Sequence, residues 1–125
     1  MTDYIQASDR LIAAYNAKDF KTIRNVVAPD LDMAHFNRNF AVKRADDLLP
    51  VLETFASTYM PDRRFEKPER VTACRNLVFR EGYWGGTPVV DIPGFGKAGE
   101  RISLKLCNVM RFDHHGILVE WKDHG

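Results

Sequence analysis

The last quarter of the chain carries a two-residue alternation that restricts the fold more than any other stretch. From residue 101 to 112 the even positions are apolar with one exception, and most odd positions are polar. Such an alternation is typical of a β-strand with one face on an apolar core. Residues 113–116, Asp-His-His-Gly, have the composition of a turn, and residues 117–123 alternate again. The sequence therefore predicts a β-hairpin.

Two polar residues interrupt the apolar faces of this hairpin. Asn108 lies in the middle of the apolar stripe of the first strand, and Asp123 ends the stripe of the second. A buried amide or carboxylate without a partner costs on the order of 1–3 kcal/mol. Each therefore needs a hydrogen-bonding partner or a ligand, which makes both residues candidates for a functional site.

The rest of the chain predicts helices first and strands after them. Apolar spacing, the cap residue Asp19 and the helix stop at Pro29 indicate three helices, over residues 4–15, 19–28 and 44–59. Strands before the hairpin are expected over residues 31–40, 63–70 and 71–84. Strands grouped after helices predict an α+β fold with an antiparallel sheet.

Composition and charge exclude several classes of partner. The 125 residues are 45% hydrophobic and 28% charged, as expected for a single globular domain over residues 1–125. The net charge of +1 provides no basic field for nucleic acid or an anionic membrane. The first residues lack a signal-peptide pattern, and no apolar run approaches the roughly 20 residues of a membrane span. Cys74 and Cys107 have no metal-type spacing and predict reduced thiols in a cytoplasmic protein.

Three stretches give the chain a resemblance to known proteins. Residues 15–20 resemble the joint between the first two helices of the nuclear transport factor 2-like superfamily, residues 94–103 resemble the SnoaL-like approach to the late strands, and residues 109–116 resemble a hairpin of ketosteroid isomerase. The superfamily also includes limonene epoxide hydrolase and scytalone dehydratase. The resemblance covers nearly the whole chain and implies a cone-shaped, cystatin-like α+β barrel. In that fold a curved mixed or antiparallel sheet wraps around a long helix, with two further N-terminal helices.

The resemblance also implies positions for catalytic residues. Asn108 stands where ketosteroid isomerase has a protonated aspartate that donates to the substrate oxyanion, and an amide can donate there too. The general-base position falls on His35, and the acidic residue near the end of the last strand of SnoaL-like cyclases corresponds to Asp123. The tyrosine position falls on Leu11, with Tyr15 one turn later. These departures argue against steroid isomerisation itself.

Each of the three catalytic candidates has a structural alternative. His35 is either a proton-transfer group or a core histidine bonded to a backbone carbonyl. Asn108 is either a ligand donor or a buried amide that bridges two strands. Asp123 orients His35, acts as the base itself, or pairs with Lys122 or Arg111 near the end of the chain.

Four further residues are candidates for substrate binding: Tyr15, Asn37, Trp84 and Trp121. The tryptophans suit the wall of a pocket for a flat apolar ligand, or else they are core packing. Asn37 follows His35 at a spacing of two and shares its face if the strand is regular; a solvated strand end is the alternative. The sequence shows no metal-ligand spacing, so neither a metal nor another cofactor is predicted.

The sequence thus predicts a cofactor-independent enzyme that acts on a compact apolar carbonyl compound by isomerisation, cyclisation or dehydration. The alternative is a non-catalytic small-ligand-binding or dimerisation module. The two differ in whether His35, Asn108 and Asp123 converge on one open cavity. The resemblance further implies a homodimer formed through the outer face of the sheet. Apolar residues are expected on that face at positions 74, 78, 107, 109 and 118.

Overall fold

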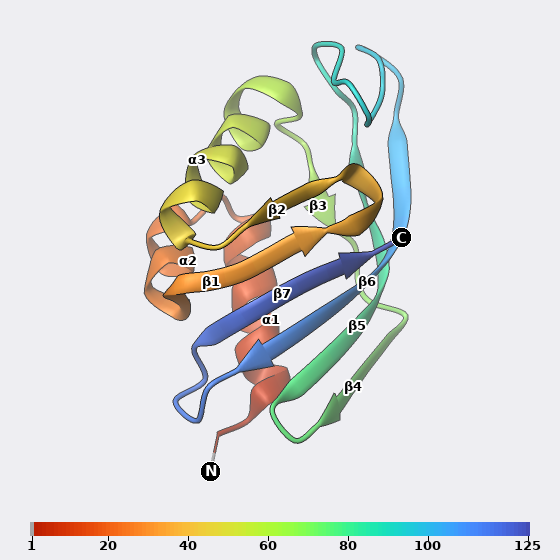
Figure 1. Cartoon of the computed structure of the whole chain (residues 1–125). Coiled ribbons are helices and arrows are strands. Elements are labelled where there is room, and N and C mark those ends of the chain that lie inside the picture. The colour runs from red at the N-terminus through yellow and green to blue at the C-terminus, as the bar shows by residue number, and fades with distance from the viewer. Residues whose placement is uncertain (1) are drawn as a thin grey trace.

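The predicted C-terminal hairpin lies in the middle of a curved sheet in the computed structural model, which describes residues 2–125 (Figure 1). The strands are β1 (Val27–His35), β2 (Phe40–Val42), β3 (Arg64–Phe65), β4 (Arg70–Cys74), β5 (Leu77–Gly86), β6 (Ile102–Phe112) and β7 (Leu118–His124). Their order is β2-β1-β7-β6-β5-β3, with β4 also paired to β5. β1 and β7 run parallel, and the other described pairs run antiparallel.

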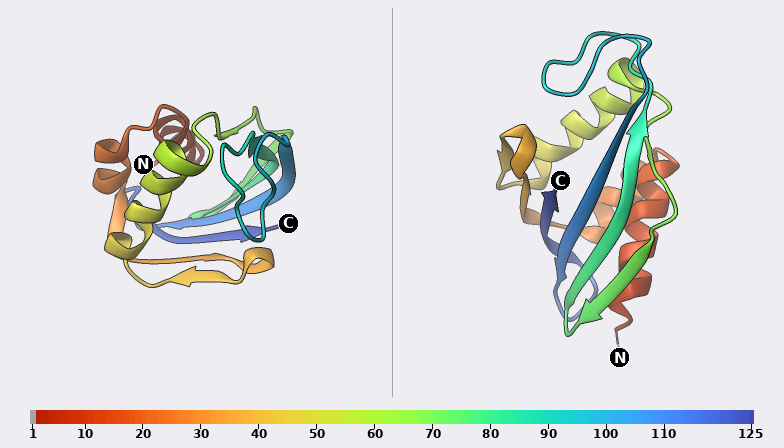
Figure 2. Two further views of the ribbon diagram at one scale, coloured as in Figure 1. Left: turned by 90° about the horizontal axis from the view of Figure 1, so that it is seen from above. Right: turned by 90° about the vertical axis from the view of Figure 1, so that its right-hand side faces the viewer.

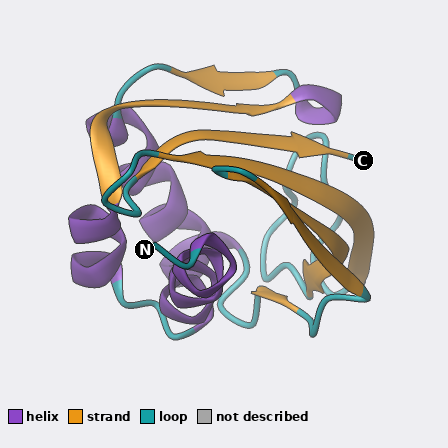
Figure 3. Cartoon of the chain, turned by 90° about the horizontal axis from the view of Figure 1, so that it is seen from below, coloured by secondary structure: helices purple, strands orange, loops and turns teal. Residues whose placement is uncertain are grey.

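Three α-helices lie inside the curve of the sheet (Figures 2 and 3). They are α1 (Tyr4–Asn16), α2 (Phe20–Val26) and α3 (Ala45–Thr54), and one π-helical turn, Phe55–Tyr59, continues α3. α1 packs against β3, β4 and β5, and α3 packs against β1. The largest fully buried apolar side chains lie between these layers: Leu11, Ile23, Leu31, Leu48, Met60, Met110, Phe112, Leu118 and Trp121. The arrangement confirms the predicted cone-shaped α+β fold.

Side-chain caps determine where the first two helices begin. The Asp3 carboxylate accepts a hydrogen bond from the backbone N–H of Gln6 at 3.0 Å. The Asp19 carboxylate accepts one from Thr22 at 3.1 Å, as the sequence predicts. Each bond satisfies a first-turn donor that has no partner within the helix.

The strand expected over residues 31–40 instead spans Val27–His35, so it both begins and ends earlier than predicted, and its early end shapes the site. β1 ends at His35, and the chain enters a 3₁₀ turn, Phe36–Arg38. Asn39 then takes a left-handed conformation with φ of 52°, and the chain reverses into β2. Asn is one of the few residues that adopts this conformation at low cost.

One other boundary also differs from the prediction. The segment 71–84 is a hairpin and not one strand, because Arg75 takes φ of 55° in a turn between β4 and β5. The third helix begins directly after Arg44, as predicted, and Pro50 lies inside it. Pro50 therefore removes an intrahelical donor.

The expected apolar patch on the outer face of the sheet is wrong at two of its five positions. Val78 pairs with Met110, and both are fully buried. Leu118 is also fully buried, because β7 carries one extra residue, Val119, relative to β6 at that point. A bulge of this kind changes the face on which the next side chain projects.

Both cysteines are free thiols, as the sequence predicts: Cys74 is exposed and Cys107 is half-buried. Within residues 2–125, no helix combines the length and the apolar character that a bilayer crossing requires.

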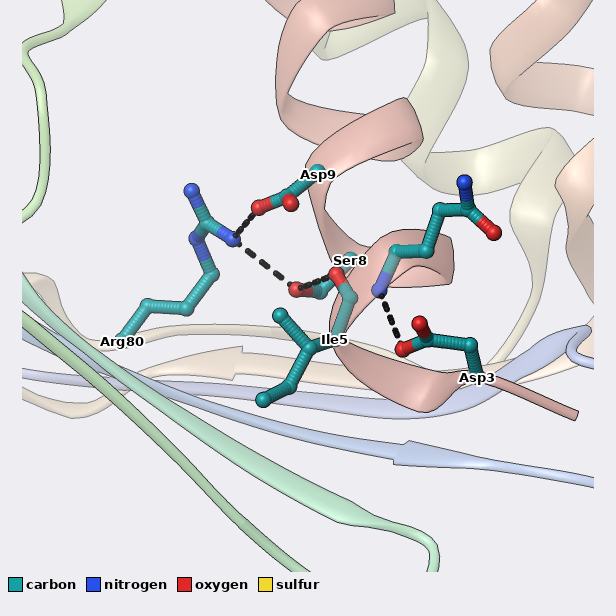
Figure 4. A network of polar contacts seen from close by, with 6 residues as sticks. Asp3, Ile5, Ser8, Asp9 and Arg80 are labelled. Atoms are coloured by element: carbon teal, nitrogen blue, oxygen red, sulfur yellow. Dashed lines mark hydrogen bonds and ion pairs between the residues drawn. The ribbon is translucent and has the colours of Figure 1, made fainter.

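A buried ionic contact holds α1 against the sheet (Figure 4). Arg80 extends from β5 to α1, where its Nη1 donates to Oγ of Ser8 at 2.9 Å and to the carboxylate of Asp9. The Ser8 hydroxyl donates in turn to the carbonyl of Ile5 at 2.8 Å. The buried guanidinium is therefore paired, as a buried charge must be.

Candidate active site

Four polar residues form one row across the concave face of the sheet. Strand pairing places His35 on β1 beside Asp123 on β7, Asp123 beside Asn108 on β6, and Asn108 beside Arg80 on β5. Directly paired residues project from the same face of a sheet. All four are buried, with exposures of 4 to 8%. We call these four residues the polar row.

The neighbouring row, two residues away along each strand, is apolar. Met33, Trp121, Met110 and Val78 pair across the same four strands, are all buried, and belong to the hydrophobic core. Because bulk water does not reach the four side chains of the polar row, they depend on one another, on other residues or on a ligand for their hydrogen bonds.

The Asp123 carboxyl is held in one orientation by two donors. Nδ2 of Asn108 lies 2.6 Å and Nε1 of Trp121 lies 2.7 Å from its Oδ1. Oδ2 accepts no hydrogen bond from residues 2–125 and belongs to a side chain that lines a cavity. Burial raises the pKa of Asp123 from its ordinary 3.8 to about 6, and the hydrogen bonds from Asn108 and Trp121 limit the rise. A carboxylate of that pKa is a stronger base than an ordinary one and is still mostly ionised at pH 7.

Asn108 contacts Asp123 and does not line the cavity. The expectation that its amide donates directly to a ligand is therefore not supported by this geometry. Asp123 also shows no hydrogen bond to His35, so the interpretation in which Asp123 orients the imidazole is wrong for this arrangement. Neither Lys122 nor Arg111 pairs with Asp123, because those side chains bind Asp32 and Glu120 instead.

His35 is buried at the side of the same cavity, and its Nε2 has no hydrogen-bonding partner in residues 2–125. Burial lowers the pKa of the imidazole from its ordinary 6.5, a hydrogen bond to the Gly125 backbone opposes this effect, and the positive charge of Arg38 adds to it. His35 is therefore neutral at pH 7. With one ring nitrogen bonded to the Gly125 backbone, Nε2 stays free to bond to another group.

Tyr15 and Trp84 also line the cavity and are joined by a hydrogen bond. Nε1 of Trp84 donates to the Tyr15 hydroxyl oxygen at 2.9 Å, which leaves the hydroxyl proton of Tyr15 available to another acceptor. Burial raises the pKa of Tyr15 to about 12. The Arg63 guanidinium, which lies 4.0 Å from the centroid of the Tyr15 ring, and the hydrogen bond from Trp84 both limit this rise. The negative charge of Asp123 adds to the rise. Tyr15 is thus a neutral hydrogen-bond donor at any physiological pH.

A cavity of about 210 Å³ joins these groups. Its polar lining comes from Tyr15, His35, Arg38, Asn39 and Asp123. The rest of the wall is apolar and largely aromatic: Met33, Phe40, Leu48, Val51, Leu52, Phe55, Phe65, Trp84, Phe95, Leu106 and Trp121. A few polar groups in an apolar concavity are typical of a small-molecule site.

The structure brings five of the seven residues selected from sequence to this cavity: Tyr15, His35, Trp84, Trp121 and Asp123. Asn108 lies behind Asp123 as described above. Asn37 is exposed and does not line the cavity, because β1 ends before it and the regular alternation stops. Residues 2–125 contain no group of three His, Cys, Asp or Glu side chains placed to hold a metal ion.

Sequence reasoning missed Arg38 and Phe95, which both line the cavity. Arg38 is carried there by the 3₁₀ turn, and the available signal was Asn39, a residue that favours a left-handed turn. Phe95 lies in the loop between β5 and β6 and packs its ring against Phe55 and Trp84 at centroid distances of 5.2 and 5.9 Å. The flanking Pro93 and Gly94 indicate a loop but not the direction of its side chains.

Solved structures with the same fold span almost the whole chain. A candidate polyketide cyclase from Pseudomonas putida KT2440 superimposes with a TM-score of 0.83 at 16% identity, covering 100% of this chain and 92% of that chain. A nuclear transport factor 2-like protein of unknown function from Burkholderia pseudomallei gives 0.79 at 18% identity, with coverages of 99% and 91%. An epoxide hydrolase of the LEH-like type from M. tuberculosis gives 0.73 at 20% identity, with coverages of 96% and 80%. At these identities the likeness establishes the fold alone.

Comparison with curated protein sequences finds no match. The family model of the SnoaL-like domain, by contrast, matches residues 9–121, from the first helix to the last strand. That span includes His35, Asn108 and the cavity wall and ends two residues before Asp123. The chain belongs to the SnoaL-like domain family.

Proposed function

We propose that this protein is a cofactor-independent enzyme that moves a proton on a compact apolar carbonyl compound, with Asp123 as the general base. The observation that carries the proposal is the Asp123 carboxyl, which is buried, held at Oδ1 by two donors, and raised in pKa to about 6 at the edge of an apolar cavity. Structural carboxylates more often pair with a cation, whereas Asp123 has no cationic partner within residues 2–125.

Residues of this chain supply both the proton acceptor and the hydrogen-bond donor that the proposed step needs. Oδ2 of Asp123 removes a proton from the carbon next to the ligand carbonyl, and the C–H electron pair moves to the carbonyl oxygen. The Tyr15 hydroxyl donates a hydrogen bond to that oxygen as its negative charge develops. Return of the proton from Asp123 to another carbon gives isomerisation. Attack of the enolate carbon on a second carbonyl, whose oxygen takes the proton from Asp123, gives cyclisation, and loss of a β-hydroxyl, which leaves as water with that proton, gives dehydration.

Asn108 and Trp121 act as positioning residues in this scheme, since both bind Oδ1 and leave the other oxygen to the ligand. The sequence hypothesis placed the base at His35. The structure favours Asp123 for that role because burial strengthens a carboxylate base and weakens an imidazole base. His35 is then a neutral acceptor beside the reacting group.

The test uses 2-indanone, a compact apolar ketone with acidic α-protons, in D₂O. Wild-type protein is expected to speed α-deuteration, measured by proton NMR, and Asp123→Asn is expected to reduce the rate at least ~10²-fold. Asn keeps an Oδ1 acceptor for both donors, so the fold is retained. Asp30→Asn is the matched control, because Asp30 is exposed and has no side-chain bond in residues 2–125. Loss of exchange in His35→Asn but not in Asp123→Asn would return the base to His35.

A ligand-binding function without turnover is the second candidate, and the aromatic character of the cavity wall favours it. In that case calorimetry would detect binding of 2-indanone, while α-deuteration would proceed at the rate of buffer alone. Deuteration above the buffer rate that Asp123→Asn abolishes would reject this candidate.

A further inference from the structure

One arginine at the cavity, Arg38, has no anionic partner among the residues that the structure describes. Arg38 lies in the 3₁₀ turn after β1 and lines the cavity, and its guanidinium carbon is 5.2 Å from the centroid of the Phe95 ring. Its Nη1 donates to the carbonyl of Asn37 at 3.3 Å. Its Nε is buried and has no hydrogen-bonding partner in residues 2–125.

Two arginines elsewhere in the fold, unlike Arg38, have carboxylate partners. Arg80 is buried and bonded to Asp9, and the exposed Arg70 pairs with Glu81 through two nitrogens. Arg38 makes no ion pair with any carboxylate in residues 2–125. The Arg38 guanidinium is half-buried, lies against an aromatic ring, and has N–H groups without an acceptor in residues 2–125. Such a group is suited to bind a carboxylate.

A second observation places the missing acceptor in the cavity. Buried nitrogens without partners in the described chain occur on three residues, His35, Arg38 and Arg63. Arg63 does not line the cavity, and its Nη2 donates to the carbonyl of Tyr15 at 2.8 Å. Nε of Arg38 is a donor on a side chain that lines the cavity, whereas Nε2 of His35, at the same cavity, is an acceptor in the neutral imidazole. An unmet buried donor costs about 1–3 kcal/mol, which a ligand oxygen bound to Nε of Arg38 would offset.

We propose that the ligand of this cavity is an apolar carboxylic acid whose carboxylate is bound by Arg38, with its ring or chain against the aromatic wall. The proposal rests on the proposed function insofar as it takes the same cavity as the ligand site. Arg38 acts in binding and specificity, while Asp123 acts on the reacting carbon. The planar guanidinium donates two parallel hydrogen bonds to a carboxylate and one or none to a neutral amide oxygen in the same place.

The test compares 2-naphthoate with 2-naphthamide, which share a ring system and differ in charge. Isothermal titration calorimetry at pH 7.5 and low salt is expected to show the acid binding at least ~10-fold more tightly than the amide. Arg38→Gln is expected to abolish the difference by weakening the acid and leaving the amide within about twofold. Arg10→Gln is the matched control, because Arg10 is an exposed arginine on α1 without a side-chain bond in residues 2–125.

Three results would overturn the proposal: equal affinity of wild type for acid and amide, an acid preference that survives in Arg38→Gln, or no binding of the acid at millimolar concentration. Loss of both ligands in Arg38→Gln would also count against it once circular dichroism shows that the variant is folded. The assay is independent of catalysis. If the protein binds the acid selectively but does not exchange the protons of 2-indanone, the proposed function is rejected and this inference stands. If the protein exchanges those protons but does not prefer the acid, this inference is rejected and the proposed function stands.

Discussion

The two ends of the polar row have the same burial and different surroundings. At one end Asn108 and Arg80 have partners within the chain: Asn108 donates to Asp123, and Arg80 is bonded to Ser8 and Asp9 on α1 (Figure 4). At the other end one oxygen of Asp123 and one nitrogen of His35 have no hydrogen-bonding partner within residues 2–125, and both side chains line the cavity.

This difference shows that burial of a polar group does not by itself indicate function. The Arg80 end is closed by hydrogen bonds, so its polarity is explained by the attachment of α1 to the sheet. At the His35 and Asp123 end, the polarity is explained only by something that enters the cavity. The predictions below test this contrast, beginning with the largest expected effect.

Tyr15→Phe should give the largest change at the open end. Losing a single donor to a developing oxyanion typically lowers the rate ~10² to 10³-fold, so we expect the kcat/KM for 2-indanone exchange to fall by about that factor. Tyr83→Phe is the matched control because Tyr83 is exposed and outside the cavity. An unchanged rate in Tyr15→Phe would remove Tyr15 from the mechanism.

Asp123→Asn should stabilise the protein in a pH-dependent way. The carboxyl has a pKa of 3.8 in the unfolded chain and about 6 in the folded protein, so its ionisation opposes folding. Below about pH 3 the group is protonated in both states and costs nothing, and above about pH 7 it costs about 3 kcal/mol. Urea unfolding should therefore show the variant more stable by about that amount at pH 8 and nearly equal at pH 3. A less stable variant at pH 8 would contradict the account.

Arg80→Met should have the opposite profile at the closed end. Met keeps an apolar stem, but the variant loses the charged hydrogen bonds to Ser8 and Asp9. We expect a loss of about 2 kcal/mol in urea unfolding, moderated because the Asp9 side chain is 58% exposed. The rate of 2-indanone exchange in folded protein should be unchanged. A large loss of rate without a loss of stability would show that the closed end also takes part in the chemistry.

Asn108→Leu should have the smallest effect on the rate of 2-indanone exchange. It tests whether Asn108 belongs to the closed end of the polar row or to the open end. The Asn108 hydrogen bond lowers the pKa of Asp123, so its removal should raise that pKa further. The midpoint of the pH–rate profile should then move to higher pH, while the rate at pH 8 stays within about threefold of wild type. A large loss at every pH with an unmoved midpoint would instead mean that Asn108 contacts the ligand.

The hairpin and the α+β class could be predicted from sequence because local signals dominate there. Period-two alternation, the turn at residues 113–116 and the cap at Asp19 each depend on neighbouring residues alone. The two interruptions of the apolar stripe, Asn108 and Asp123, could be selected for the same reason, and they prove to bond to one another.

The partners across the sheet could not be predicted, because strand pairing is not a local property. The parallel pairing of β1 with β7 sets His35 beside Asp123, and nothing near either residue specifies it. The end of β1 was also missed, because the polar residues 37–39 lie between the apolar Phe36 and Phe40 and do not by themselves end a strand. That misreading placed Asn37 on the pocket face and concealed Arg38.

The most direct measurement of the central claim is a ¹³C NMR titration of protein labelled at the aspartate carboxyl carbon. Asp123→Asn identifies the resonance by its loss. A buried, doubly hydrogen-bonded carboxyl facing an apolar cavity should titrate with a midpoint of about 6. A midpoint near the ordinary 3.8 would show that Asp123 is neither desolvated nor suited to act as the base.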